Sequence, residues 1–217
     1  MVQSGARDPM VNELGYLKET ASQTAGPYVH IGLAPKAVGI EVSDDHVSNV
    51  LAGPKTKGER IRIEGRVLDG TGTPVRDILL EIWQANAAGK YNHPADRQPK
   101  PIDPTFRGWG RASSDFTSGV YTFETVKPGS VTGRGGRPMA PHVTFFLLAR
   151  GINVGLVTRM YFSDEEAANA SDPVLNMIEW EVRRKTLIAK HEVKKGAVVY
   201  RFDIHLQGPE ETVFFDV

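Results

Sequence analysis

The stretch from Gly129 to Gly151 reads GSVTGRGGRPMAPHVTFFLLARG, a loop rich in glycine, proline and arginine that runs directly into an apolar segment starting at His142. Side chains of a β-strand alternate between its two faces, so this segment separates into two sets. One set is His142, Thr144, Phe146 and Leu148, and the other is Val143, Phe145, Leu147 and Ala149. Because the second set is wholly apolar and the first begins with polar residues, we predict a strand with a site at its first residue.

The same alternation recurs on both sides of this strand. It is strictest from Arg60 to Leu68, where isoleucine and valine alternate with charged residues before a DGTGTP turn. Further strands are predicted at residues 77–84, 119–126, 155–162, 197–207 and 211–217, and a long proline-containing loop at 92–110. Many short strands separated by Gly/Pro turns predict a mainly β fold, a β-sandwich of antiparallel strands.

The two ends of the chain depart from this pattern. Near the C-terminus, helices are predicted at residues 164–170, with Asp164 as cap, and at 173–190, with Asp172 as cap and Pro173 in the first helical position. Residues 1–35 lack a period and are predicted to form an extended N-terminal arm. Apolar side chains within it indicate that the arm is bound to something rather than solvated. Residues 36–217 then form one domain.

Composition excludes several classes of function. The chain has 217 residues, and its 26 Lys and Arg balance 26 Asp and Glu, so nothing favours nucleic acid or an anionic membrane as partner. No cysteine is present, which excludes disulfides, thiolate metal sites and cysteine nucleophiles. We find no continuous apolar segment of the kind that a signal peptide or a membrane span needs, and we expect a cytoplasmic protein.

Three residues are candidates for chemistry: Tyr91, His142 and Arg150. Tyr91 lies just beyond a strand end, where a phenol could ligate a ferric ion, meet a substrate or pack under the loop. His142 could be a metal ligand or a hydrogen-bonded structural residue, and Thr144 two positions later is a poor ligand. Arg150, beside a glycine at a strand end, could present its planar fork to a carboxylate or form a salt bridge with a neighbouring acid.

Several segments together resemble the intradiol ring-cleaving dioxygenases: EIWQANAAGKY, the proline-rich loop, FETVKPG, PMAPH and YRFDIHLQG. The resemblance covers most of the chain. It implies a β-sandwich core, a ferric ion (Fe(3+)) held by two tyrosines and two histidines, and O2-dependent opening of a catechol ring between its two hydroxyl-bearing carbons. Some members of the family consist of two related subunits, α and β, of which β carries the iron.

The resemblance places only part of the family's ligand set in this chain. The first iron tyrosine falls on Tyr91 and the first iron histidine on His142, whereas the second histidine position holds Thr144. The second tyrosine position holds Ser130 and Val131. One tyrosine and one histidine offer too few ligands for the site.

Where the family has its catalytic arginine, this chain has Met139 or Ala140. These departures resemble those of an α subunit, with Tyr91 and His142 as vestigial ligand positions. The resemblance therefore implies no metal ligand set and no catalytic residue in this chain alone, and iron in a homologous β subunit.

For an α subunit the resemblance implies a supporting role at the partner's active site. Thr24, Gly26, Pro27 and Tyr28 resemble the arm that lines the mouth of the β subunit's site, and Arg150 resembles the arginine that steers the substrate carboxylate. The implied partners are the β subunit, in an αβ pair that assembles further, a small aromatic substrate and O2.

Two alternatives stay open at the level of sequence. One is a self-sufficient intradiol dioxygenase in which His93 or Tyr121 replaces a missing iron ligand. The other is a β-sandwich that binds a partner without catalysis. Metal content separates the first from the α-subunit hypothesis, and the presence of a homologous partner separates the second.

Overall fold

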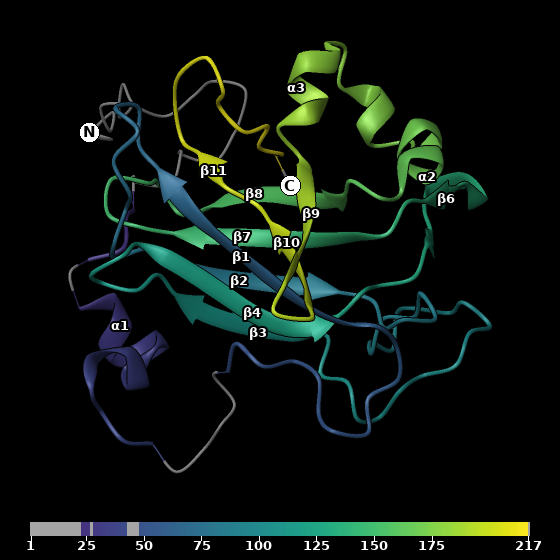
Figure 1. The fold of residues 1–217 in the computed structure, drawn as a ribbon, viewed down its shortest axis with the longest axis horizontal. Coiled ribbons are helices and arrows are strands. Elements are labelled where there is room, and N and C mark those ends of the chain that lie inside the picture. The colour runs from purple at the N-terminus through teal and green to yellow at the C-terminus, as the bar shows by residue number, and fades with distance from the viewer. Residues whose placement is uncertain (1–22, 27, 43–47, 217) are drawn as a thin grey trace, which may run out of the picture.

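The computed structural model of the chain describes residues 23–26, 28–42 and 48–216. Within these residues, nine strands form one large mixed sheet in the order β11-β1-β10-β9-β8-β7-β2-β3, with β4 paired to β1 (Figure 1). The strands are β1 Arg60–Leu68, β2 Leu79–Gln84, β3 Trp109–Ser113, β4 Val120–Val126, β7 His142–Leu148, β8 Leu156–Phe162, β9 Ile188–Lys194, β10 Ala197–Arg201 and β11 Ile204–His205. A separate small pair consists of β5 Val131–Thr132 and β6 Pro138–Met139.

The strand predicted from His142 onward is confirmed as β7, in the middle of the sheet. It pairs antiparallel with β2 on one side and with β8 on the other. Val143, Phe145 and Leu147 are fully buried, as the alternation predicts. Thr144 on the opposite face is half-buried, so this face is the one that side chains of a site can use.

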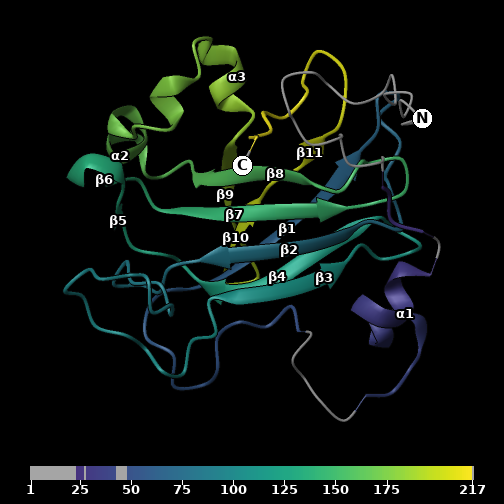
Figure 2. The same ribbon diagram turned by 180° about the vertical axis from the view of Figure 1, so that it is seen from behind.

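The two halves of the sheet face each other, as the ribbon in Figure 2 shows from the reverse side, and the main apolar core lies between them. Tyr121 and Phe123 of β4 pack on Phe145 of β7, with ring centroids 6.0 and 6.1 Å apart and in edge-on geometry. The predicted β-sandwich is thereby confirmed. Its strands are mixed in direction, because β1 with β10, β1 with β11 and β8 with β9 are parallel pairs.

The predicted helix over residues 173–190 is wrong. In its place the chain forms a 3-10 turn, one short helix and then the strand β9, which pairs parallel with the end of β8. Leu187 and Ala189 are fully buried there, so packing against the sheet outweighs their helical propensity. The helices are α1 Val29–Leu33, α2 Glu166–Ser171 and α3 Glu181–Lys185, and the 3-10 turns are η1 Pro35–Val38, η2 Arg134–Gly136 and η3 Leu175–Met177.

Three smaller predictions also need correction. Asp164 does not cap α2, since its carboxylate accepts hydrogen bonds from Lys127 and Tyr200 instead. The predicted strand at 211–217 is reduced, within the described residues, to one bridge between Phe215 and Val157. The predicted loop 92–110 ends earlier, because β3 begins at Trp109. In the described part of the chain, no helix has the length and apolar character needed to cross a membrane.

Candidate functional site

The two residues predicted to be vestigial ligand positions, Tyr91 and His142, are brought together at the start of β7. The hydroxyl of Tyr91 lies 3.3 Å from Nε2 of His142. The ring of Tyr91 stacks on Trp83 of β2, with centroids 5.8 Å apart and an interplanar angle of 5°. Tyr91 therefore packs against β2 and also reaches the histidine.

The hydrogen bonds of His142 define its tautomer. Its Nδ1 lies 2.7 Å from the carbonyl oxygen of Ala140, and because a carbonyl can only accept, Nδ1 carries the proton. Burial lowers the pKa of His142 to about 4, assisted by the nearby charge of Arg159. The imidazole is then neutral at pH 7, and its Nε2 accepts a hydrogen bond from the Tyr91 hydroxyl.

The neighbouring strand β8 contributes a cation and a second phenol to the same face. The register places Tyr161 opposite His142 and Arg159 opposite Thr144. Arg159 lies close enough to lower the pKa of Tyr91, against the larger effect of burial, which raises it. The sequence analysis missed Arg159 and Tyr161. Their alternation within residues 155–162 was visible, but the pairing register that places them beside His142 was not.

These groups do not fit a ferric ion. Only Tyr91 and His142 match the family's donors, and the hydroxyl of Tyr161 donates to Asp172 and has its pKa raised by burial, which opposes the phenolate that iron requires. The guanidinium of Arg159 adds a positive charge that disfavours a second cation. In the described part of the chain, no three His, Cys, Asp or Glu side chains gather where they could hold a metal.

The two residues considered as replacement ligands lie in different places. Tyr121 is fully buried in the core, where its hydroxyl donates to the carbonyl oxygen of Phe202, so it is unable to replace a ligand. His93 does line the same 820 Å³ groove as Tyr91. It is exposed, however, and its Nδ1 accepts the backbone N–H of Ala95.

We expect the neutral, buried state of His142 to make stability depend on pH. Its folded pKa of about 4 lies below the ordinary value of 6.5, so below pH 6.5 the unfolded chain takes up a proton that the folded chain does not. The contribution to stability is complete above pH 6.5 and is lost as the pH falls towards 4. Urea unfolding at several pH values should show that the free energy of unfolding changes less with pH in His142→Gln than in the wild type.

Burial also lowers the pKa of His30, so His30 adds to the pH dependence of stability in the wild type. The test is therefore the difference between wild type and His142→Gln in how the free energy of unfolding changes with pH. Equal pH dependence of the two proteins would contradict a neutral, buried His142.

A buried carboxylate, Asp172, joins the segment that bears η3 to this site. Its Oδ2 accepts the N–H of Ala140 at 2.8 Å, and its Oδ1 accepts the N–H groups of Val174 and Leu175 at 2.8 Å and the hydroxyl of Tyr161 at 3.2 Å. The predicted cap residue thus caps a 3-10 turn and also holds the backbone that positions His142.

Asp172→Ala is expected to lower the free energy of unfolding by about 3 kcal/mol or more, since each buried donor left without an acceptor costs about 1–3 kcal/mol. Chemical denaturation of the purified protein measures this. Glu181→Ala on α3 is the control, because Glu181 is an exposed acid in a surface ion pair. Equal losses in the two variants would contradict the role given to Asp172.

A second group of predicted residues lies at the other end of β7. Thr24 bridges the turn after the strand: its hydroxyl donates to the carbonyl oxygen of Ala149 and accepts the N–H of Gly151 at 2.9 Å. Arg150, between these two residues, is exposed and donates from Nε to Asp77. The structure thus places Thr24 directly beside Arg150. His142 and Arg150 are eight residues apart, about 26 Å at about 3.3 Å per strand residue.

Two other predicted arm residues, Gly26 and Tyr28, belong to the described part of the chain. Gly26 is exposed and accepts the N–H of Val29, while Tyr28 is 76% exposed. Pro27, like residues 1–22, lies outside the described residues. The structure therefore brings Thr24 to Arg150 and leaves Tyr28 directed to solvent.

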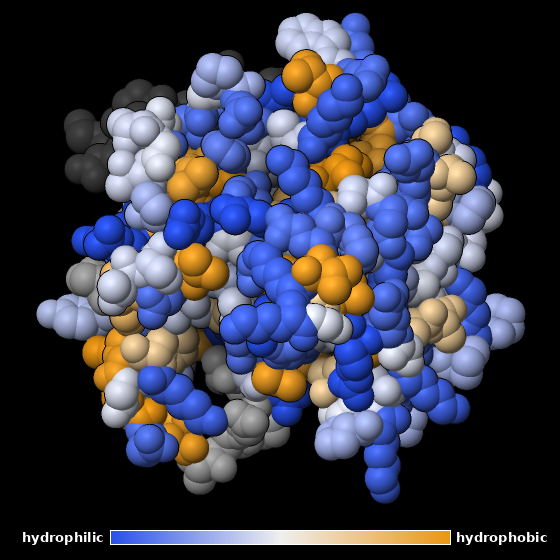
Figure 3. Space-filling view, viewed as in Figure 1, coloured by the Kyte–Doolittle hydropathy of each residue, from blue (hydrophilic) through white to orange (hydrophobic). Residues whose placement is uncertain are grey.

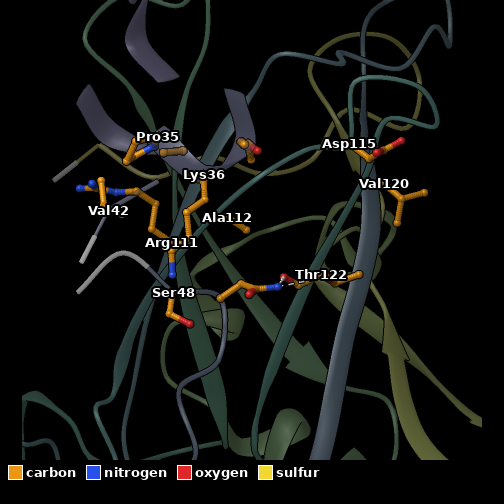
Figure 4. A pocket seen from close by; sticks show the side chains of 13 residues that line it. Pro35, Lys36, Val42, Ser48, Arg111, Ala112, Asp115, Val120 and Thr122 are labelled. Atoms are coloured by element: carbon orange, nitrogen blue, oxygen red, sulfur yellow. Dashed lines mark hydrogen bonds between the residues drawn. The ribbon is translucent and has the colours of Figure 1, made fainter. Parts of the chain in front are cut away.

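The arm is fastened to the sandwich at a pocket of 340 Å³ between η1 and strands β3 and β4 (Figure 4). Arg111 of β3 donates from Nη1 to the carbonyl oxygen of Leu33, at the end of α1. The same guanidinium pairs with Glu81 of β2, so its charge is already compensated. We therefore read this pocket as the anchoring point of the arm.

Apolar side chains gather on the outer surface of the region from α1 to just after η1, where the predicted arm joins the domain. Orange residues lie at the lower left of Figure 3, over α1 and η1. Exposed apolar residues of this region are Tyr28, Ile31, Val38 and Ile40. Exposed apolar side chains that gather in one region are typical of a protein–protein contact.

Comparisons with known proteins agree with this arrangement. A family profile described as "Dioxygenase" matches residues 35–208. The chain is 52% identical to the protocatechuate 3,4-dioxygenase alpha chain of Pseudomonas putida, over 92% of this chain and 97% of that one. It belongs to the intradiol dioxygenase family.

The chain is also similar to other intradiol dioxygenases. The protocatechuate 3,4-dioxygenase beta chain of Burkholderia cepacia is 40% identical, over 77% of this chain and 73% of that one. The crystal structure of 3-chlorocatechol 1,2-dioxygenase from Rhodococcus opacus 1CP shares the fold, with a TM-score of 0.57 at 22% identity, over 72% of this chain and 62% of that chain. Intradiol dioxygenases are non-haem iron enzymes, and alpha and beta chains occur as separate relatives of this chain.

Proposed function

We propose that this chain is the α subunit of a protocatechuate 3,4-dioxygenase. It pairs with a homologous β subunit that holds the ferric ion, and the pair uses O2 to open the ring of protocatechuate, giving 3-carboxy-cis,cis-muconate. The iron supplies the oxidative chemistry from the partner chain. This chain supplies part of the wall of the partner's active site and selects the substrate.

The observation that carries this proposal is the contrast between the two ends of β7. At one end, Tyr91 and His142 remain without further family ligands, beside the charge of Arg159. At the other end, an exposed guanidinium stands next to a docked arm, in a position to meet a carboxylate that a partner's active site holds. A chain that selects the substrate and leaves the metal to its partner needs both of these properties.

In this proposal Arg150 contacts the substrate carboxylate, and Thr24, Gly26, Pro27 and Tyr28 line the mouth of the partner's active site. The exposed apolar residues of α1 and η1 support such a contact, because partner binding removes them from water. Residues 1–35 act as the arm and 36–217 as the sandwich domain. Cytoplasmic localisation remains a prediction.

The test is to purify the chain alone and together with its β partner. Iron and ring cleavage are expected only in the pair. A lone chain that binds iron and cleaves the ring would support a self-sufficient enzyme instead. A stable monomer that does not bind the β chain would support a binding module.

A further inference from the structure

In the described part of the chain, the guanidinium of Arg150 is held by its Nε edge alone. Nε donates to Oδ2 of Asp77 at 2.6 Å, while the side chain as a whole is 62% exposed. Asp77 precedes β2, the strand that pairs with β7, so both partners stand on neighbouring strand ends of one sheet. This pairing is one of the simple outcomes that the sequence allows for Arg150.

The unpaired edge is the one that suits a carboxylate. A guanidinium has five N–H donors in a planar fork, and Nη1 and Nη2 together match the two oxygens of a carboxylate. Within the described residues, neither of these two nitrogens of Arg150 donates to the protein. An acid that accepts a hydrogen bond from Nε fixes the plane of the guanidinium and leaves Nη1 and Nη2 available to a carboxylate.

The backbone of Arg150 is held as firmly as its side chain. The Thr24 hydroxyl bonds to the residues on both sides of it, and the Gln23 N–H donates to Oδ1 of Asn153 at 2.7 Å. The N–H of Val154 returns a bond to the carbonyl oxygen of Gln23. The arm and the turn after β7 are therefore one hydrogen-bonded unit.

The second ionisable group near Asp77 is His30 of α1. It is buried, with 4% of its surface exposed, and its ring packs edge-on against Phe116. Burial lowers the pKa of His30 more than the charge of Asp77 raises it, so the imidazole is neutral at pH 7. The negative charge of Asp77 is then compensated by Arg150 rather than shared with His30.

We propose that Asp77 is a positioning residue for substrate recognition, holding the Arg150 guanidinium by its Nε edge so that Nη1 and Nη2 face the carboxylate of an aromatic acid in the partner's active site. This inference rests on the proposed function. Preorganisation of this kind acts on binding and leaves the chemical step unchanged, because the side chain is ordered before the substrate arrives.

Steady-state kinetics of the assembled αβ enzyme test the proposal, with protocatechuate and with catechol, which lacks the carboxylate. Asp77→Ala is expected to raise KM for protocatechuate about three- to tenfold, the cost of ordering one long side chain, with little change in kcat. Kinetics with catechol should not change. Asp77→Glu, which keeps an acceptor for Nε, should recover part of the lost affinity.

A double variant separates positioning from a general effect on folding. In an Arg150→Ala background, Asp77→Ala should have no further effect on KM, since its only route to the substrate has been removed. Glu181→Gln on α3 is the control for loss of an exposed acid, and thermal denaturation checks that each variant is folded. An equal effect of Asp77→Ala on both substrates, or an additive effect with Arg150→Ala, overturns the inference.

The outcomes also distinguish this inference from the function on which it rests. If Arg150→Ala raises KM for protocatechuate and Asp77→Ala does not, the proposed function stands and Asp77 is an ordinary surface partner. If Arg150→Ala itself has no effect, Arg150 does not meet the substrate, and both the inference and the role given to Arg150 fail.

Discussion

Purified without a partner, the chain is expected to be colourless, to contain no stoichiometric iron and to show no ring cleavage, whereas the chain co-purified with its β subunit is expected to be burgundy and active. The physical reason is the number of donors: one phenol and one imidazole are too few, and Arg159 opposes a cation beside them. Metal analysis, the visible spectrum and oxygen uptake with protocatechuate measure the three expected properties.

Variants at the vestigial pocket provide the matched control. In the αβ enzyme, Tyr91→Phe and His142→Gln should leave the iron content unchanged, because neither residue holds the metal. The assignment of iron to the partner would be refuted if either substitution removed iron from the αβ pair. It would also be refuted if the lone chain bound iron and cleaved the ring.

Arg150→Ala in the αβ enzyme is expected to lower kcat/KM for protocatechuate about ten- to a hundredfold. A hydrogen bond to a charged group contributes about 1.5–3 kcal/mol, and about 1.4 kcal/mol corresponds to a factor of ten. The effect should fall mainly on KM, and catechol should be cleaved as before, because it offers no carboxylate. Arg150→Lys should recover part of the loss, since it keeps the charge and loses the planar fork.

Arg201→Ala is a suitable control for this prediction. Arg201 is an exposed arginine whose Nε donates to Asp203 at 3.0 Å, so it has the same kind of Nε–carboxylate contact as Arg150 at another place on the surface. A similar loss in both variants would mean that removal of an exposed cation, and not of a substrate contact, causes the effect.

The strands with strict alternation could be predicted from the sequence because every second residue is apolar and therefore faces the core. Residues 60–68 and β7 are the clearest cases, and both occur in the structure with the predicted inward faces. β3 was missed because its sequence WGRAS has one aromatic residue and no β-branched one, so its strand structure comes from pairing with β2.

The helix predicted at 173–190 failed for a related reason. Local signals indicated its start correctly, since Asp172 does cap the turn that follows it. These local signals carried no information on which later residues would pair with β8 as a further strand. Leu187 and Ala189 fill that place against β8, and tertiary packing therefore ended the helix at Lys185.

The candidate site was predictable in its residues and not in its contacts. Tyr91 and His142 were predicted from their places beside strand ends and were matched to iron-ligand positions through the family resemblance, and their 3.3 Å contact supports reading them as one pocket. Arg159 and Asp77 were not found, because each acquires its meaning from a neighbour far away in sequence: Thr144 and His142 for the first, and Arg150 for the second. Such pairs depend on strand register, which one sequence does not reveal.

The length of β7 has a consequence for how this protein can change over time. Its two ends are too far apart for substitutions at one to alter the energetics of the other, since effects at sites more than about 10 Å apart usually add independently. Under the proposed function, recognition around Arg150 is thus free to change without disturbing the packing of Tyr91 and His142 at the far end of the strand. A library of variants restricted to the turn after β7 is a direct route to enzymes that accept differently substituted catechols.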